Sequence, residues 1–226
     1  AVNRTVRAQF PDAIRCAVGV HPRVCPEETL RRLELDFVIC GEAERSFPAA
    51  IESIEKGNPV EAMAGVASIG AGGSLVAGPP SGFVENLDDL PISDRSLIAD
   101  YAFYLQPPGT IRGLVRRGIA NILTSRGCPH SCVFCQSRHT MGRRLRTRSP
   151  GHVCTEIGLL KQRYGIRGVF FVDDSLTLRR EWVIALCEEM IARGLGLQWA
   201  CQSRADSLDR DLVRIMKAAG CIQIDI

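Results

Sequence analysis

Three cysteines near the middle of the chain, Cys128, Cys132 and Cys135, have the residue type and the spacing of a metal site. Cysteine thiolates are the usual protein ligands of iron–sulfur clusters. A C-x3-C-x2-C run supplies only three of them, so one iron of a cubic cluster stays without a protein ligand. That open iron can bind a small molecule and pass an electron to it. The spacing therefore predicts a redox-active 4Fe–4S cluster with one open position.

Two other metal sites fit this spacing less well. A structural zinc site is closed by four ligands, usually in paired C-x2-C knuckles. The compact run of a bacterial ferredoxin is C-x2-C-x2-C-x3-C, and its fully ligated cluster only transfers electrons. A zinc-stabilised binding module stays open as an alternative from another class of protein. Metal analysis distinguishes the two hypotheses: the cluster contains iron and sulfide, whereas the zinc-stabilised module contains one zinc ion.

The composition favours a globular protein of the cytoplasm. The chain has 226 residues, of which 46% are hydrophobic and 23% charged, enough for one large domain or two smaller ones. Nothing at the N-terminus resembles a signal peptide, and no apolar stretch has the length of a membrane span. A net charge of +3 gives no reason to expect nucleic-acid binding.

The other seven of the ten cysteines are scattered singly through apolar stretches. We interpret them as small buried hydrophobic residues in a reducing compartment, and not as metal ligands. They are Cys16, Cys25, Cys40, Cys154, Cys187, Cys201 and Cys221.

Residues 1–78 are expected to form part of an α/β domain. Strands alternate with helices here, which implies a doubly wound, Rossmann-like parallel sheet. A connector at residues 79–118 follows. The expected elements are strands at 14–20 and 35–40, a helix opened by Pro26, a helix that stops at Gly57, and a hairpin at 63–77.

From residue 119 onward the alternation has the longer units of a parallel α/β barrel. Residues 119–226 supply four strands, or half of a closed barrel. Because the chain starts at Ala1 and stops inside the last expected strand, we expect a piece of a longer protein with exposed, aggregation-prone sheet edges. The expected strands are 119–124, 168–172, 197–201 and one from 221, and the helices are 150–164, 181–194 and 209–219.

The chain resembles the radical S-adenosylmethionine (SAM) enzymes that carry an N-terminal cobalamin-binding domain. The resemblance is weaker over residues 1–60 than over the barrel half. The chain departs from the family in two ways: Gly19-Val20 stands where the family often has a glycine pair, and no D-x-H-x-x-G segment is present. Without that segment there is no reason to assign His21 as a cobalamin ligand, and we interpret it as a loop residue. The matching runs are Gly19–Pro22, Cys40–Glu44, Asp88–Pro91, Phe171–Asp174, Gln202–Asp206 and Met216–Cys221, besides the cysteine loop.

The resemblance implies three cofactors: a 4Fe–4S cluster on Cys128, Cys132 and Cys135, SAM on its open iron, and cobalamin. An electron from a donor such as flavodoxin or ferredoxin would cleave SAM to a 5′-deoxyadenosyl radical. The implied reaction is methyl transfer or radical rearrangement on a small-molecule substrate. A methylthiotransferase acting on RNA or protein is the alternative, although Cys16, Cys25 and Cys40 do not clearly form that family's extra cluster site.

Four candidate SAM contacts follow from the resemblance, each with a structural alternative. Phe134 would lie against the adenine, or pack the loop onto the barrel. Asp173 and Asp174 end a barrel strand, where barrel active sites form, and would accept hydrogen bonds from the SAM amine or ribose, or cap the next segment. Arg204 would clamp the SAM carboxylate, or pair with Asp206.

Two further sets of residues complete the predicted sites. Gly41 and Glu42 lie in the run that resembles the cobalamin domain, and become candidate cobalamin contacts. A basic run follows the cysteine loop and is interpreted as a solvated loop, with a substrate phosphate or cobalamin's polar groups as alternative partners. It consists of Arg138, Arg143, Arg144, Arg146 and Arg148.

Overall fold

The computed structural model describes residues 2–105 and 118–226. The chain divides into two compact units. The first contains Ala1–Glu85 and Ser131–Gly142, and the second contains Asn86–His130 and Arg143–Ile226. The first unit therefore includes a segment from the C-terminal half of the chain, which the predicted boundaries at 78 and 119 did not anticipate. The predicted connector 79–118 lies partly outside the described residues.

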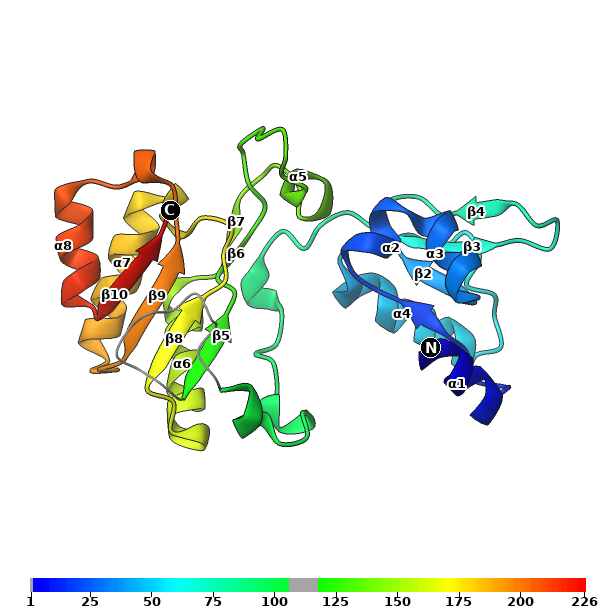
Figure 1. Cartoon of the computed structure of the whole chain (residues 1–226), viewed down its shortest axis with the longest axis horizontal. Helices are drawn as coiled ribbons and strands as arrows, with labels where there is room; N and C mark the ends of the chain where they lie inside the picture. Colours follow the sequence, from blue (N-terminus) through cyan, green and yellow to red (C-terminus); the bar gives the residue numbers. More distant parts are fainter. Residues whose placement is uncertain (1, 106–117) are drawn as a thin grey trace. The chain divides into compact units, whose positions relative to one another are not determined.

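The first unit contains a four-stranded sheet with the order β1-β2-β3-β4 (Figure 1). β1 and β2 are parallel, as predicted. β3 is antiparallel to both β2 and β4, so the predicted hairpin extends the sheet and makes it mixed. The strands are β1 (Cys16–Ala17), β2 (Phe37–Ile39), β3 (Val66–Ile69) and β4 (Leu75–Ala77).

β2 is buried on both faces because a helix packs on each. Leu30 of α3 packs with Val38 on one face, and Ala50 of α4 packs with Phe37 and Ile39 on the other. This doubly wound arrangement agrees with the predicted α/β fold class. The helices are α1 (Val2–Gln9), α2 (Val20–Val24), α3 (Pro26–Leu33), α4 (Ala43–Glu55) and α5 (Ser137–Thr140).

The interpretation of His21 as a loop residue is wrong, because His21 lies in the short helix α2. Gly19 precedes this helix with a φ of 124°, a conformation that glycine adopts without strain. Two residues after the helix ends, Pro26 starts α3, whose first turn carries Glu27 and Glu28. Proline at the first position and acids in the first turn favour a helix start, as predicted.

The second unit is built on a parallel sheet with the order β10-β9-β8-β5. Each strand lies beside the previous one after a helical crossover, which is the arrangement predicted for half of an α/β barrel. The elements are β5 (Ile119–Ile122), α6 (Pro150–Tyr164), β8 (Gly168–Phe171), α7 (Arg180–Ala192), β9 (Gln198–Gln202), α8 (Arg210–Ala218) and β10 (Cys221–Asp225).

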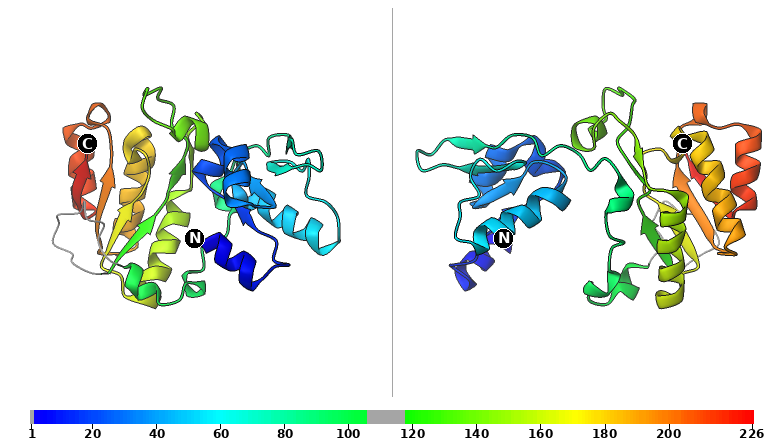
Figure 2. Two further views of the ribbon diagram at one scale, coloured as in Figure 1. Left: turned by 45° about the vertical axis from the view of Figure 1, so that its right-hand side comes forward. Right: turned by 180° about the vertical axis from the view of Figure 1, so that it is seen from behind.

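The three helices α6, α7 and α8 lie along one face of this sheet (Figures 1 and 2). Val153 and Ile157 of α6 are fully buried against Phe171 and Trp199 of the sheet. The opposite face carries a small apolar cluster that includes Phe170. In a barrel that second face lines the interior, so the two-sided burial agrees with the predicted architecture.

Short elements complete the second unit. A two-stranded antiparallel ribbon pairs Ser125 with Thr147 and Arg126 with Arg146. No helix in the described part of the chain combines the length and apolar character needed to cross a membrane. The short elements are β6 (Ser125–Arg126), β7 (Arg146–Thr147), and the 3-10 helices Leu87–Asp89, Arg95–Leu97, Tyr101–Tyr104, Leu176–Leu178 and Ala205–Ser207.

Candidate functional site

The three predicted cluster cysteines lie in a stretch without regular secondary structure between β6 and α5. All three are free and partly exposed. The backbone N–H of Cys135 donates to the carbonyl of Cys132 over 3.1 Å, and the N–H of Ser137 donates to the thiol of Cys135 over 3.5 Å. Backbone N–H groups that reach sulfur are a feature of iron–sulfur sites, where they tune the reduction potential.

The boundary between the two units falls within the sequence of the cysteine loop. Cys128 belongs to the second unit, whereas Cys132 and Cys135 belong to the segment that packs in the first. Within residues 2–105 and 118–226, no three His, Cys, Asp or Glu side chains are arranged to hold a metal ion. The case for a cluster therefore depends on the donor set, which is three thiols on one short, accessible loop.

Three of the other seven cysteines differ from the loop cysteines in burial. Cys154, Cys187 and Cys201 are buried, as predicted, while the remaining four are only partly buried. Burial raises the pKa of Cys154 to about 11 and the pKa of Cys187 to about 12. A thiol with a raised pKa stays protonated at neutral pH and is a poor metal ligand. This argues against Cys154 and Cys187 as ligands.

Asp173 is fully buried at the end of β8, and its carboxylate binds the chain just before the cysteine loop. Asp173 Oδ1 accepts hydrogen bonds from the Thr124 N–H at 3.1 Å, the Thr124 hydroxyl at 2.9 Å and the Ser125 hydroxyl at 2.5 Å. Burial raises the pKa of Asp173, and the bonds from Ser125 and Thr124 offset part of that rise. In this structure Asp173 neither faces solvent nor caps the next segment; it fixes the start of the loop.

The other predicted SAM contacts are more accessible. Asp174 is exposed, and Phe134 is 86% exposed. Arg204 forms the predicted alternative ion pair, with its Nε and Nη2 at 2.9 and 2.6 Å from the carboxylate of Asp206. Hydrogen bonding to Arg204 holds the pKa of Asp206 below its usual value.

Glu42 and Gly41, the predicted cobalamin contacts, touch the start of the connector. Glu42 is buried and its Oε2 accepts a hydrogen bond from the Val84 N–H at 2.7 Å. A Cβ on Gly41 would lie 2.2 Å from the hydroxyl oxygen of Ser81, so a larger residue there would require the Ser81 side chain to move. Glu42 therefore holds the chain after β4, and Gly41 packs closely beside it.

A cavity of about 510 Å³ lies in the first unit beside these residues. It is at the carboxyl end of β2, where parallel α/β sheets bind their ligands. Polar groups reach it from α2 and from the segment that carries α5. Its lining residues include Arg23, Cys40, Pro79, Pro80, Gln136 and His139.

The interpretation of the basic run as a solvated loop is wrong for its last members. Arg146 is buried, and Arg148 donates to the Leu123 carbonyl at 3.1 Å and pairs with Glu156 at 2.6 Å. Arg143 and Arg144 are exposed, while the side chain of Arg138 lies outside the described residues. The end of the run therefore supports the fold around the loop.

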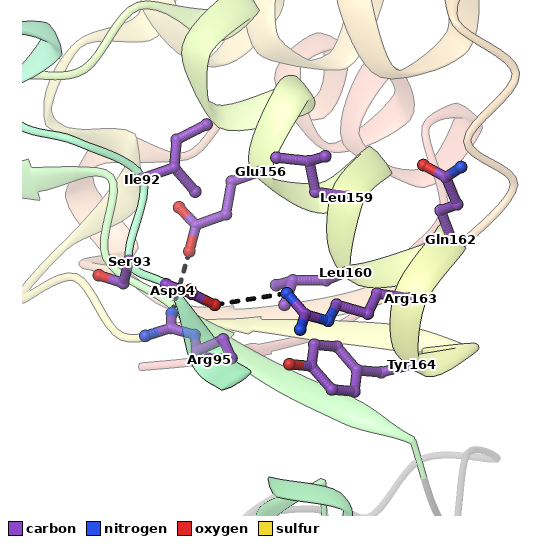
Figure 3. Close-up of a pocket in the computed structure, with 10 residues that line it drawn as sticks. All are labelled: Ile92, Ser93, Asp94, Arg95, Glu156, Leu159, Leu160, Gln162, Arg163 and Tyr164. Atoms are coloured by element: carbon purple, nitrogen blue, oxygen red, sulfur yellow. Dashed lines mark hydrogen bonds and ion pairs between the residues drawn. The ribbon is translucent and has the colours of Figure 1, made fainter. Parts of the chain in front are cut away.

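Glu156 is a buried carboxylate that the sequence analysis missed. Its side chain is 5% exposed and pairs with both Arg148 and Arg95. Arg95 approaches Oε1 to 2.9 Å (Figure 3). The signal was a glutamate three positions after Val153 on the predicted buried face of α6. Asp88 adds a second link, because its Oδ1 accepts from the Ser149 N–H at 2.9 Å. Together these contacts hold the connector on the start and middle of α6.

A cavity of about 530 Å³ lies between the connector and α6 in the second unit (Figure 3). The ion pair of Asp94 with Arg163 crosses it at 3.4 Å, beside the pair of Arg95 with Glu156. None of the predicted site residues lines it. We assign no cofactor to this cavity.

Comparisons with known proteins agree with this architecture. The family model of the radical SAM superfamily matches residues 122–226. An uncharacterized methyltransferase from Pyrococcus horikoshii is 31% identical over 204 residues, covering 90% of this chain and 42% of the relative. The chain therefore spans less than half of that relative's length.

Two solved structures share the fold. The radical SAM methyltransferase TsrM from Kitasatospora setae, with tryptophan substrate and a SAM analog, gives a TM-score of 0.75 at 18% identity, covering 99% of this chain and 42% of that one. The cobalamin-dependent SAM radical enzyme OxsB, with aqua-cobalamin and SAM bound, gives a TM-score of 0.79 at 17% identity. The match covers 99% of this chain and 32% of OxsB. Residues 122–226 are a radical SAM domain by this match.

Proposed function

We propose that the chain is the cofactor-binding part of a cobalamin-dependent radical SAM methyltransferase acting on a small molecule. The observation that carries the proposal is the set of three free, partly exposed thiols within eight residues of one loop. The methyltransferase class is supported by the similarity to the uncharacterized methyltransferase of Pyrococcus horikoshii and to the methyltransferase TsrM. When bound, the cluster and SAM supply one-electron cleavage of the SAM sulfonium bond.

The residues of this chain have separate tasks in that proposal. Cys128, Cys132 and Cys135 hold three irons and leave the fourth for SAM. Asp173 fixes the strand end before the loop through Thr124 and Ser125, so that the loop starts from a rigid base. Exposed Phe134 and Asp174 would contact SAM, and half-buried Arg204 would exchange its pair with Asp206 for the SAM carboxylate.

Cobalamin is assigned to the cavity at the carboxyl end of β2. Arg23, Gln136 and His139 bring hydrogen-bonding groups to its wall, which suits the amide groups around a corrin ring. Glu42 supports the cavity by holding Val84 of the connector, and Gly41 leaves room for the Ser81 side chain. Because Gln136 and His139 follow the last cysteine closely, a ligand here would touch the end of the cluster loop.

Metal analysis tests the cluster. Anaerobic reconstitution of the 226-residue chain is expected to give about four irons with equal sulfide and a broad visible absorbance. Each of the variants Cys128→Ala, Cys132→Ala and Cys135→Ala is expected to lose most of the iron, while Cys154→Ala, the matched buried control, keeps it. One equivalent of zinc without sulfide in the wild-type chain would support the zinc-stabilised module instead.

Two further measurements test the other cofactors. SAM is expected to change the electron paramagnetic resonance (EPR) spectrum of the reduced cluster, because it binds the open iron. Because the sheet of the first unit is expected to be incomplete, the 226-residue chain is expected to retain cobalamin only weakly on gel filtration, and His139→Ala and Gln136→Ala to weaken that retention further. A chain that holds its cluster and still elutes free of cobalamin would show that the first unit shares only the fold of cobalamin domains.

A further inference from the structure

Arg23 joins three elements of the first unit. It lies in α2, and its guanidinium donates a hydrogen bond to the carbonyl of Thr140, the last residue of α5. The same guanidinium lies over the ring of Phe83, 5.2 Å from its centroid. A cation over an aromatic face is attracted to it, and a charged donor strengthens the bond to the carbonyl.

Gly142, which follows α5 in the sequence, also contacts the ring of Phe83. Its φ is +82°, and a Cβ there would lie 2.9 Å from two carbons of the Phe83 ring. The ring therefore packs directly on the backbone of Gly142, which is buried. We call Arg23, Phe83, Thr140 and Gly142 the α5 clamp.

The α5 clamp holds the segment that carries the second and third cysteines of the loop. Short-range hydrogen bonds run from the clamp back to both thiol-bearing residues. The Met141 N–H donates to the Ser137 carbonyl at 2.7 Å, the Ser137 N–H to the Cys135 thiol, and the Cys135 N–H to the Cys132 carbonyl. A fixed end at Thr140 therefore restricts where Cys135 and Cys132 lie.

We propose that Arg23 and Phe83 are positioning residues for the cluster, acting from the first unit on Cys132 and Cys135. Neither side chain is a ligand; they act through Thr140 and Gly142. The packing holds without any cofactor, and only its consequence for the cluster rests on the proposed function. The first unit is then part of the structure that assembles the cluster, besides being a cobalamin-domain fold.

Amide hydrogen exchange of the cluster-free chain tests the packing. Arg23→Ala and Phe83→Ala are expected to speed exchange of the Thr140 and Met141 amides about tenfold, since a charged hydrogen bond and a cation–π contact are lost. Arg31→Ala is the matched control, because Arg31 of the same unit also donates to a backbone carbonyl, that of Gly73. Equal exchange of the segment in Arg23→Ala and Arg31→Ala would overturn the proposal.

Cluster stability tests the consequence. After reconstitution, iron is expected to pass to a chelator about tenfold faster from Arg23→Ala than from Arg31→Ala, with an altered EPR spectrum of the reduced cluster, while Phe83→Tyr keeps the wild-type values. Faster exchange with unchanged iron release and EPR spectrum would mean that the clamp does not position the cysteines. A wild-type chain without iron would contradict the proposed function, and hydrogen exchange would still decide the packing.

Discussion

Two parts of the molecule use their polar groups in opposite ways. One is the cysteine loop. The other, which we call the frame, consists of buried Asp173 and Glu156 with the residues that bind their carboxylates. In the frame, Asp173 is fully buried and Glu156 is 5% exposed, and each accepts hydrogen bonds from side chains around it. In the loop, Val133 is 97% exposed and Phe134 is 86% exposed, and the thiols are free. The two carboxylates of the frame have protein partners of their own, whereas the loop exposes apolar surface and thiols that a cofactor would cover.

The largest effect on stability is expected for Glu156→Ala, which removes the carboxylate between Arg95 and Arg148. Breaking a buried ion pair from one side typically costs about 3–5 kcal/mol, because the remaining charges lose their partner. Urea unfolding followed by tryptophan fluorescence measures it, since Trp182 and Trp199 both lie in the second unit. Glu189→Ala removes a half-exposed ion pair on α7 as a control and is expected to cost less than about 1 kcal/mol. Equal losses of unfolding free energy in the two variants would show that the ion pairs of Glu156 stabilise the fold no more than a half-exposed pair does.

The second effect is a pH dependence that belongs to Asp173. Burial raises its folded pKa above the usual value near about 4, so the folded state holds the proton more tightly than the unfolded state. This contribution is fully present at low pH and is lost as the pH rises between the unfolded and the folded pKa. The slope approaches about 1.4 kcal/mol per pH unit in that window.

Comparison with Asp173→Asn isolates that contribution from those of other carboxylates. The stability difference between wild type and Asp173→Asn is expected to shift against the wild type as the pH rises from 4.5 toward neutral, at about the slope given above. Urea midpoints across that range measure it. A difference that is constant with pH would mean that Asp173 has an ordinary pKa despite its burial.

The sequence predicted the helices and strands of the second unit better than the contacts between them. The bounds of α6 agree with the prediction because its signals are local: Ser149 caps the start and Gly165 ends it in the left-handed conformation. The bond between Asp173 and Thr124 joins residues 49 positions apart, and no local pattern encodes it.

The same limit applies to the loop. Its cysteine spacing is local and predicts a chemistry directly. Packing of residues 131–142 into the first unit depends on Arg23 and Phe83, which lie far away in the sequence. The burial of Glu156 was missed because it depends on two arginines that neutralise its charge. These arginines, Arg95 and Arg148, come from the connector and from the residues after β7, so no pattern within α6 predicts them.

A smaller effect is expected for the core cysteines. Cys187→Ala removes a fully buried thiol whose pKa is raised to about 12, and is expected to cost about 1 kcal/mol while iron content stays unchanged. Cys154→Ala and Cys201→Ala are expected to behave in the same way. Loss of iron in any of the three would contradict the distinction between core and loop cysteines, and would place that thiol near the cluster.

The smallest effect on stability, and the sharpest on binding, is expected for Arg204. Its pair with Asp206 is exposed, with side chains 39% and 64% accessible, and such pairs contribute about 0–1 kcal/mol. Arg204→Ala should therefore leave the urea midpoint nearly unchanged. If Arg204 clamps the SAM carboxylate, this variant should weaken SAM binding by about tenfold or more, since a bidentate charged contact is lost.

The partner variant Asp206→Ala separates the two roles of Arg204. A clamp that must leave Asp206 before it binds SAM should bind SAM more tightly once Asp206 is gone, so the two variants should shift the SAM dissociation constant in opposite directions. A purely structural pair predicts no shift in either variant. EPR titration of the reconstituted chain with SAM measures both constants, and equal constants in wild type, Arg204→Ala and Asp206→Ala would assign Arg204 a purely structural role.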